Sequence, residues 1–285
     1  MTTIPISRKW RRWKLGLRTL FGASPAGYFI PYRYAAETAK AAGRPHYPAI
    51  EAMMDQAAPT MKAWLTKASK YQEEFASFGN ATPPDPRWQQ SWFPRLDGMM
   101  AYVLTREFRP ERIVEIGSGH STRFYYRAIH DGELETKFHA IDPAPRADIA
   151  TLPITVERAI VQKADPAIFK TLSGADILSI DSSHILMPGT DVDLLFSTII
   201  PTLPSGTTIH IHDITLPDDY PEIWHWRGYN EQQGVASLLA GNGFEILWSS
   251  AYATTRLASL VDQSIANSIH LPDGAIETSL WLCKR

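Results

Sequence analysis

The stretch RIVEIGSGHST, residues 112–122, constrains the fold of this chain more than any other. Residues 113–116 form the short apolar run that is typical of a buried parallel strand. The run ends in a turn with two glycines, Gly117 and Gly119, and residues 121–129 have a helical pattern. Glycine lets the backbone pass close under a ligand, and the helix N-terminus offers unpaired N–H groups. The stretch therefore predicts a nucleotide-like ligand at the first strand of an open α/β sheet.

The spacing of the glycines separates two classes of cofactor. A dinucleotide site has the pattern G-x-G-x-x-G, but Thr122 stands in the third glycine position here. The pattern Glu-x-Gly-x-Gly, which begins at Glu115, resembles motif I of the class I methyltransferases that use S-adenosylmethionine (SAM). SAM has no phosphate and carries an ammonium and a sulfonium group, so an acidic residue suits it. We predict that SAM contacts Glu115, Gly117, Ser118 and Gly119; the alternative is a glycine-rich turn in another Rossmann-like domain.

A second acidic residue strengthens the prediction of SAM over a nicotinamide cofactor. The run FHAID, residues 138–142, predicts a short strand that ends in Asp142, roughly 20 residues past the glycines. A carboxylate at this place accepts hydrogen bonds from both ribose hydroxyls. The alternative is a surface turn, because Asp142 precedes Pro143.

Composition limits the classes of protein that remain. The chain has 285 residues and a net charge of -2, which gives no general case for binding nucleic acid. The single cysteine, Cys283, excludes a disulfide framework and fits a reducing cytoplasm. No apolar run reaches transmembrane length. We expect a helical extension in residues 1–85, as a lid or subunit contact, and a SAM-binding domain in residues 86–285.

The N-terminal segment differs from the rest of the chain because it is strongly basic. On a helical wheel, one face collects five apolar residues, with basic residues around the remainder: Trp10, Trp13, Leu17, Leu20 and Phe21. One interpretation is a helix that lies on a membrane surface. The interpretation that we favour is a helix whose aromatic face packs on the domain or on a second subunit, which would give a homo-oligomer.

Strand and helix patterns alternate along the chain. Helices are expected at residues 50–78, 95–107, 121–129, 191–200 and 230–242. Strands are expected at residues 112–116, 138–142, 154–157, 176–181, 207–213, 244–248 and 277–283. The alternation predicts a Rossmann-like α/β fold with a mainly parallel sheet. The last two strands have no obvious helix between them, so they fit an antiparallel pair.

Several motifs in order extend the resemblance over about residues 90–283. The segments IDSSH, LPSG and HIHDI, which begin at residues 180, 203 and 210, resemble the bacterial family of class I methyltransferases known as methyltransferase domain 24. The resemblance implies a seven-stranded sheet whose last strand is antiparallel, and SAM-dependent methyl transfer. It also implies that the loop after the third strand, with Gln162, lies beside the adenine, and that Asp181 contacts the cofactor region.

Methyl transfer requires a nucleophile that attacks the methyl carbon in line, so the enzyme chiefly orients and desolvates the acceptor. A hydroxyl acceptor must also lose a proton, to a base or through a metal. His184 and His212 are the candidate bases, with His120 less favoured, and Asp181 lies beside them at the end of a strand. The alternative is that these histidines complete hydrogen-bond networks at the strand ends.

Two neighbouring strands end in acidic residues, which makes a divalent metal one of two open possibilities. Asp181 and Asp213 should lie at the same edge of the sheet, because adjacent strands are roughly 5 Å apart. The catechol O-methyltransferases, which this site resembles, hold magnesium with acids at similar strand ends. Here His212 stands where an acid is expected, and imidazole favours manganese, iron or zinc. The tentative ligands are Asp181, His212 and Asp213; the alternative is a metal-free site in which Asp181 contacts the acceptor.

Three functions follow from these patterns. The first is methyl transfer from SAM to an oxygen or nitrogen of a small molecule. The second is a metal-dependent hydroxylase on the same fold, similar to the cephalosporin hydroxylases, and the third is a binding protein without catalysis. Five aromatic residues either line an acceptor pocket or pack in a loop: Trp92, Tyr220, Trp224, Trp226 and Tyr229.

Overall fold

The computed structural model describes residues 6–22, 26–28, 30–38, 46–79, 82–145 and 147–285. A seven-stranded sheet forms its centre, in the order β3-β2-β1-β4-β5-β7-β6. Strand β7 is antiparallel to both of its neighbours, whereas the other pairs are parallel. The strands are β1 (Arg112–Ile116), β2 (Lys137–Ile141), β3 (Thr155–Glu157), β4 (Ile177–Ile180), β5 (Thr208–Ile211), β6 (Phe244–Ser249) and β7 (Leu280–Lys284). The predicted fold class is confirmed.

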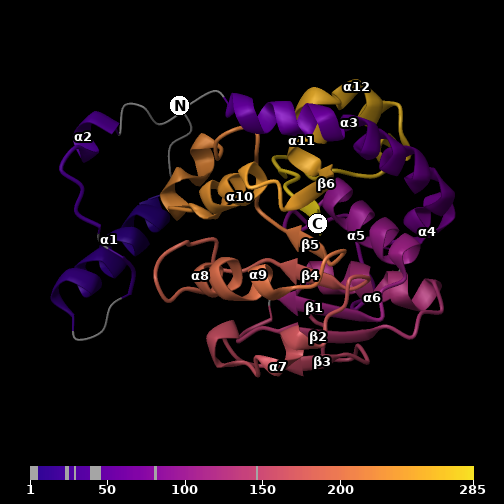
Figure 1. Ribbon diagram of the computed structural model, residues 1–285, viewed down its shortest axis with the longest axis horizontal. Helices are drawn as coiled ribbons and strands as arrows, with labels where there is room; N and C mark the ends of the chain where they lie inside the picture. Colours follow the sequence, from indigo (N-terminus) through magenta and orange to yellow (C-terminus); the bar gives the residue numbers. More distant parts are fainter. Residues whose placement is uncertain (1–5, 23–25, 29, 39–45, 80–81, 146) are drawn as a thin grey trace.

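Helices cover both faces of the sheet (Figure 1). Helices α5 (Arg95–Phe108) and α6 (His120–Asp131) pack together on one side. The other side carries α10 (Glu231–Ala240) and a continuous helical segment made of α8 (Asp191–Leu194), the π-helical turn η4 (Leu195–Ile199) and α9 (Ile200–Thr202). Helix α6, the α8–α9 segment and α10 follow β1, β4 and β5 and connect successive strands, which is the arrangement that alternating patterns predict.

The helical segment before the sheet belongs to the same hydrophobic core. Helix α3 (Pro48–Ala68) contacts β6 and α5, and continues through η2 (Ser69–Tyr71) into α4 (Gln72–Ser77). Met54, Met61 and Leu65 are buried, so the methionine and leucine stripe of this segment packs in the core as its spacing predicts. The hydrophobic core includes residues on both sides of residue 85. The domain boundary that the sequence predicted there stays a prediction.

Short helices account for most of the differences from the sequence prediction. Between β6 and β7 the chain forms α11 (Ser250–Arg256), α12 (Ala258–Asp262) and η6 (Ile265–Ser268), where no helix was expected. The Ser249 hydroxyl caps α11 by accepting a hydrogen bond from the Tyr252 amide. The segments η3 (Val161–Lys163), α7 (Ala167–Lys170) and η5 (Glu222–Arg227) are also new. None is long enough to establish a helical period in the sequence.

The N-terminal segment projects from the body of the molecule (Figure 1). It contains α1 (Ile6–Phe21) and the short α2 (Ala35–Thr38). Trp10, Trp13 and Phe21 are exposed, so this aromatic face does not pack on its own domain, and its packing on a second subunit stays a prediction. Part of the predicted extension lies outside the described residues, namely 1–5, 23–25, 29, 39–45 and 80–81. None of the described helices is long and apolar enough to cross a lipid bilayer.

Candidate active site

The glycine-rich turn after β1 lies in close contact with the end of β4. Gly117 has a φ of +78°, and a Cβ at this position would lie 1.8 Å from the carbonyl oxygen of Asp181. The Gly117 amide donates to the Ile141 carbonyl, while the Asp181 amide donates to the Ile116 carbonyl. Only glycine can adopt this backbone conformation and also leave room for the Asp181 carbonyl oxygen. The first glycine of the motif is therefore a requirement of the fold.

Glu115 lies beneath the turn and supports helix α6 from inside the protein. Its side chain is fully buried, and its two carboxyl oxygens accept hydrogen bonds from the Ser121 and Thr122 hydroxyls at 2.6 and 2.5 Å. Burial raises the pKa of Glu115 to about 8, although both hydroxyls act in the opposite direction. The residues that line the two cavities described next do not include Glu115. Its contact with SAM stays a prediction.

The first cavity, with a volume of about 880 Å³, lies at the carboxyl ends of the parallel strands. Gly117, Ser118, Asp142, Gln162 and Asp181 line it, so five of the predicted cofactor residues come together here. Asp142 follows β2 and accepts hydrogen bonds from the Ser118 amide at 2.6 Å and the Ser118 hydroxyl at 3.0 Å. Ligands of open α/β sheets bind at this edge. We refer to this space as the cofactor cavity.

The second cavity, of about 800 Å³, adjoins the first and shares Ser118, Asp181 and Arg227 with it. We refer to it as the acceptor cavity. Its lining includes Gly119 and His120 together with four of the five predicted aromatic residues: Trp92, Trp224, Trp226 and Tyr229. Tyr220 does not line it; its ring packs against Tyr229, with centroids 6.0 Å apart. The N-terminal segment also contributes to the wall, through residues such as Leu15 and Tyr28.

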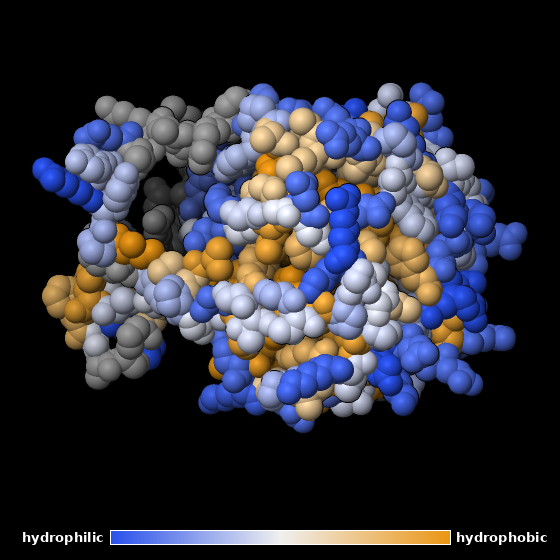
Figure 2. Space-filling model, in the orientation of Figure 1, coloured by the Kyte–Doolittle hydropathy of each residue, from blue (hydrophilic) through white to orange (hydrophobic). Residues whose placement is uncertain are grey.

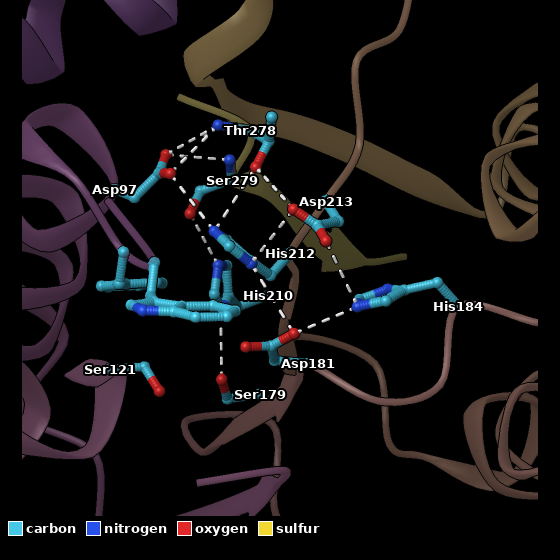
Figure 3. A network of polar contacts seen from close by, with 12 residues as sticks. Asp97, Ser121, Ser179, Asp181, His184, His210, His212, Asp213, Thr278 and Ser279 are labelled. Carbon is cyan, nitrogen blue, oxygen red and sulfur yellow. Dashed lines mark hydrogen bonds and ion pairs between the residues drawn. The ribbon is translucent and has the colours of Figure 1, made fainter. Parts of the chain in front are cut away.

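Two histidines and two aspartates converge in the acceptor cavity (Figure 3). Strands β4 and β5 pair in parallel with Ile180 opposite Ile211, so the residues that follow each strand meet at one edge. His184 Nε2 lies 3.2 Å from an Asp181 oxygen and 3.4 Å from an Asp213 oxygen. His212 Nδ1 lies 3.7 Å from each of the same carboxylates. The structure therefore brings these four predicted side chains together.

A buried carboxylate supports each of these histidines from behind. His184 Nδ1 lies 2.8 Å from Glu231 Oε2, and His212 Nε2 lies 3.3 Å from Asp97 Oδ2. Both carboxylates are fully buried, and Asp97 also accepts from the Thr278 and Ser279 amides. Glu231 begins α10 and Asp97 lies in the first turn of α5, so neither belongs to a strand-end motif. The sequence prediction missed Glu231.

The carboxylates determine the charge of both rings. Burial alone lowers the pKa of His184, but the hydrogen bonds to Asp181 and Glu231 outweigh it and raise that pKa well above its usual value. The pKa of His212 is raised in the same way, chiefly by Asp181. Burial would raise the pKa of Asp181, but His212 and His184 hold it well below its usual value. Both shifts favour the imidazolium form of the two rings that lie beside Asp181 and Asp213.

The other two histidines near the site are neutral at pH 7. His210 is fully buried in β5 between the hydroxyls of Ser179, Tyr125 and Ser279, and burial lowers its pKa to about 3. It is a structural residue of the sheet. His120 lines the acceptor cavity, and burial, with smaller effects of nearby arginines, lowers its pKa to about 4.

The donors of the predicted metal set bind one another in this structure. Across the part of the chain that the structure describes, no group of three or more histidine, cysteine, aspartate or glutamate side chains is arranged to hold a metal ion. Asp181, His212 and Asp213 instead form ion pairs. A metal at these residues stays a prediction.

Comparisons with known proteins agree with this architecture. The family described as "Methyltransferase domain" (Methyltransf_24) matches residues 114–214, which run from β1 to the end of β5 and include Asp181, His184, His212 and Asp213. A comparison with curated proteins finds no match.

Several solved structures match this chain at low sequence identity and low TM-score. An SAH-bound methyltransferase from Podospora anserina, PaMTH1, is 14% identical over 91% of this chain and 99% of its own, with a TM-score of 0.41. An O-methyltransferase from Bacillus cereus in complex with SAH is 11% identical over 78% of this chain and 91% of its own, with a TM-score of 0.41. CmcI with Mg and SAM is 16% identical over 75% of this chain and 84% of its own, with a TM-score of 0.41.

The family match covers most of the residues that line the cofactor cavity, but only part of the lining of the acceptor cavity. The strand order and the antiparallel β7 are the features that the resemblance to methyltransferases implies. Residues 114–214 therefore match a methyltransferase-domain family, Methyltransf_24, within a sheet of the class I methyltransferase type.

Proposed function

We propose that the chain transfers the methyl group of SAM to an oxygen or nitrogen of a small aromatic acceptor, with His184 as the base. The observation that carries the proposal is the junction between the two cavities, where Asp181 lines both and His184 lies 3.2 Å from it. Methyl transfer needs a donor and an acceptor on either side of one point, aligned for displacement. Two adjoining cavities with a polar cluster at their junction meet that need.

The residues of the cofactor cavity fit SAM. The Gly117–Gly119 turn leaves its backbone open, since an added Cβ at Gly119 would have its nearest neighbours 3.9 Å away. Asp142 offers carboxylate oxygens to the ribose hydroxyls, and Gln162 lies where the adenine is expected. SAM bound here supplies a methyl group on a sulfonium, which is electrophilic without further activation.

The acceptor cavity favours a flat acceptor. Trp92, Trp224, Trp226 and Tyr229 provide ring faces, and Arg227 lies over three of these rings, with its guanidinium carbon 4.3 Å from the Trp224 centroid. Aromatic walls of this kind bind rings by stacking and by apolar contact. A phenol, catechol or aromatic amine would present its nucleophile to His184 and Asp181.

His184 can remove the acceptor proton only in its neutral form. Glu231 holds Nδ1, so Nε2 is the nitrogen that faces the cavity. Because the pKa of His184 is raised, the neutral ring is scarce at pH 7 but strongly basic where it occurs. The imidazolium of His212 stabilises an acceptor oxygen that becomes negative. The rate should therefore rise with pH beyond the ordinary range of histidine.

A metal-assisted form of the same reaction is a second candidate. Each histidine has a buried carboxylate behind its far nitrogen, and histidine–carboxylate pairs of this kind are common around metal ions. A divalent ion at Asp181, His212 and Asp213 would need the rings to lose their protons and the side chains to move from their ion pairs. It would lower the pKa of an acceptor hydroxyl. Imidazole favours manganese, iron or zinc over magnesium.

One experiment separates these functions. The full chain, treated with a chelator, is incubated with SAM and a panel of catechols, phenols and aromatic amines, and formation of S-adenosylhomocysteine is measured. We expect turnover with one of these classes, and loss of turnover but not of SAM binding in His184→Asn. Restoration of activity by one added metal alone would establish the metal-assisted form.

Two results would contradict methyl transfer. Tight SAM binding with no turnover, with or without metals, would favour a binding protein. Oxygen consumption and a hydroxylated product without S-adenosylhomocysteine would favour the hydroxylase. Aliphatic acceptors that react while aromatic ones do not would contradict the proposed acceptor class only.

A further inference from the structure

Helix α1 turns its most hydrophobic side chains toward solvent. Trp10 is 73% exposed, Trp13 is 69% exposed and Phe21 is 83% exposed, and Leu17 and Leu20 are exposed beside them. These five residues lie on one helical face. Figure 2 shows hydrophobic residues on the arm at the left of the molecule that contains this helix. A contiguous apolar face of this kind on a protein surface indicates a binding partner.

The opposite side of the same helix faces the acceptor cavity. Arg11, Leu15 and Thr19 line the acceptor cavity, on the side of the helix that faces away from the two tryptophans. Leu20, at the edge of the apolar face, also lines the cavity. The helix therefore lies between the acceptor cavity and whatever covers its tryptophan face. Rotation of the helix to bury the tryptophans would expose this wall of the cavity.

The charge of this segment identifies the class of partner. Residues 1–36 contain seven lysines and arginines and no acidic residue, whereas the whole chain has a net charge of -2. The remaining 249 residues therefore carry a net charge of -9. Basic residues that border an apolar face with tryptophan are characteristic of helices that lie in the headgroup region of anionic membranes.

A second copy of the chain is a poorer match for this face. Ten of the thirteen large hydrophobic side chains that are exposed in the described part of the chain lie between residues 10 and 34. The other three, Trp92, Ile160 and Ile223, are far apart in the sequence, so the described residues of the body offer a second copy few exposed apolar side chains to pack against. Pairing of two α1 helices would place two basic segments side by side, which charge repulsion opposes.

We propose that α1 is a membrane-surface helix, which binds an anionic lipid bilayer through Trp10, Trp13, Leu17, Leu20 and Phe21 and through the basic residues around them. The bilayer covers the apolar face, and the helix brings the mouth of the acceptor cavity to the lipid surface. This inference does not depend on the methyl acceptor or on the role of His184.

Sedimentation with lipid vesicles tests the proposal. The full chain is mixed with vesicles of phosphatidylcholine alone and with vesicles that also contain phosphatidylglycerol. We expect binding to the anionic vesicles that weakens as salt is raised, because charge attraction is screened. The double variant Trp10→Ser, Trp13→Ser should bind the anionic vesicles roughly 10-fold more weakly, since binding scales with buried apolar area. Lys14→Glu should weaken binding only where the lipid is anionic.

A matched control separates this effect from damage to the fold. Ile223→Ser removes an exposed apolar side chain from the body of the molecule and should leave vesicle binding unchanged. SAM affinity of the double variant should equal that of the parent chain, because neither tryptophan lines a cavity. Equal binding to both vesicle types, or binding to neither, would overturn the proposal. A lipid-free dimer that the double variant dissociates would instead assign this face to a second copy.

Discussion

His184 and Glu231 are joined by a hydrogen bond of 2.8 Å between Nδ1 and Oε2, and both side chains are buried. His184 has a φ of +60°, which is uncommon for a residue with a side chain, so the loop after β4 holds it in a strained conformation. The pairing fixes which ring nitrogen faces the acceptor cavity. Glu231 thus positions His184, although it comes from a helix on another part of the chain.

The Glu231→Gln variant should lower the pKa of His184. Removal of the Glu231 charge takes away one of the interactions that favour the imidazolium, and burial, which opposes it, remains. The proton resonances of the ring, followed by NMR against pH, report the change without any acceptor. With an acceptor, we expect kcat to fall roughly 10- to 100-fold. The acid limb of the rate profile should move to lower pH, because a weaker base is neutral at lower pH.

Two observations would contradict a positioning role for Glu231. One is an unchanged titration of His184 in a folded Glu231→Gln protein. The other is a loss of SAM affinity equal to the loss of kcat, which would indicate general damage to the site. Asp193→Asn provides the matched control, because Asp193 lines neither cavity and accepts hydrogen bonds from Gly189 and Ser197 rather than from His184.

Gly117→Ala should destabilise the protein far more than another glycine with the same backbone conformation. Gly117 and Gly189 have φ values of +78° and +82°, so alanine is strained at both. At Gly189 an added Cβ meets no atom within 4 Å, whereas at Gly117 it lies 1.8 Å from the Asp181 carbonyl oxygen. We expect Gly189→Ala to cost about 1–2 kcal/mol. Gly117→Ala should cost at least about 3 kcal/mol, because overpacking adds to the strain. Urea unfolding measures both, and equal losses would refute the role of the close approach.

Asp142→Ala should weaken SAM binding about 10-fold or more, because charged hydrogen bonds contribute about 1.5–3 kcal/mol each. The variant also removes the acceptor of the Ser118 amide and hydroxyl, so the turn itself loses support. Ser118→Ala keeps the carboxylate and removes only the hydroxyl, so it separates the two effects in a calorimetric titration. Asp148→Ala, at an exposed position of the same loop outside both cavities, is the control. Unchanged affinity in folded Asp142→Ala protein would rule out the ribose contact.

Strand patterns predicted the sheet and the convergence of the cluster, because adjacent parallel strands end at one edge. Asp181 and His212 therefore could be placed together from sequence alone. The partners behind the histidines could not, since Glu231 is 47 positions from His184 and Asp97 is 115 positions from His212. Local sequence patterns do not predict these histidine–carboxylate pairs, because the pairs depend on how α5 and α10 pack on the sheet.

The orientation of side chains was the other limit. Glu115 fits a cofactor motif by spacing, but its carboxylate points under the turn to Ser121 and Thr122. The helical wheel of α1 predicted its apolar face correctly. Periodicity alone, however, does not show which face of a helix packs against the rest of the protein. In the structure, the side of α1 with Arg11 and Thr19 lines the acceptor cavity, and the tryptophans are exposed to solvent.

Glu115→Gln should reveal a loss of stability with rising pH that belongs to this one group. The pKa of Glu115 is raised from 4.5 to about 8 by burial, so the folded chain holds this proton more tightly than the unfolded chain does. Its contribution to stability is therefore complete below about pH 4.5 and is lost as the pH rises toward 8. The free energy of unfolding then falls by at most about 1.4 kcal/mol per pH unit.

Glutamine does not titrate, so the free energy of unfolding of the parent chain should fall relative to that of the variant across this range. Urea unfolding at several pH values measures the difference, with the exposed Glu111→Gln as control for the substitution itself. A difference that is constant between pH 5 and 8 would show that Glu115 is ionised throughout, and its hydrogen bonds to Ser121 and Thr122 would then stabilise a buried carboxylate.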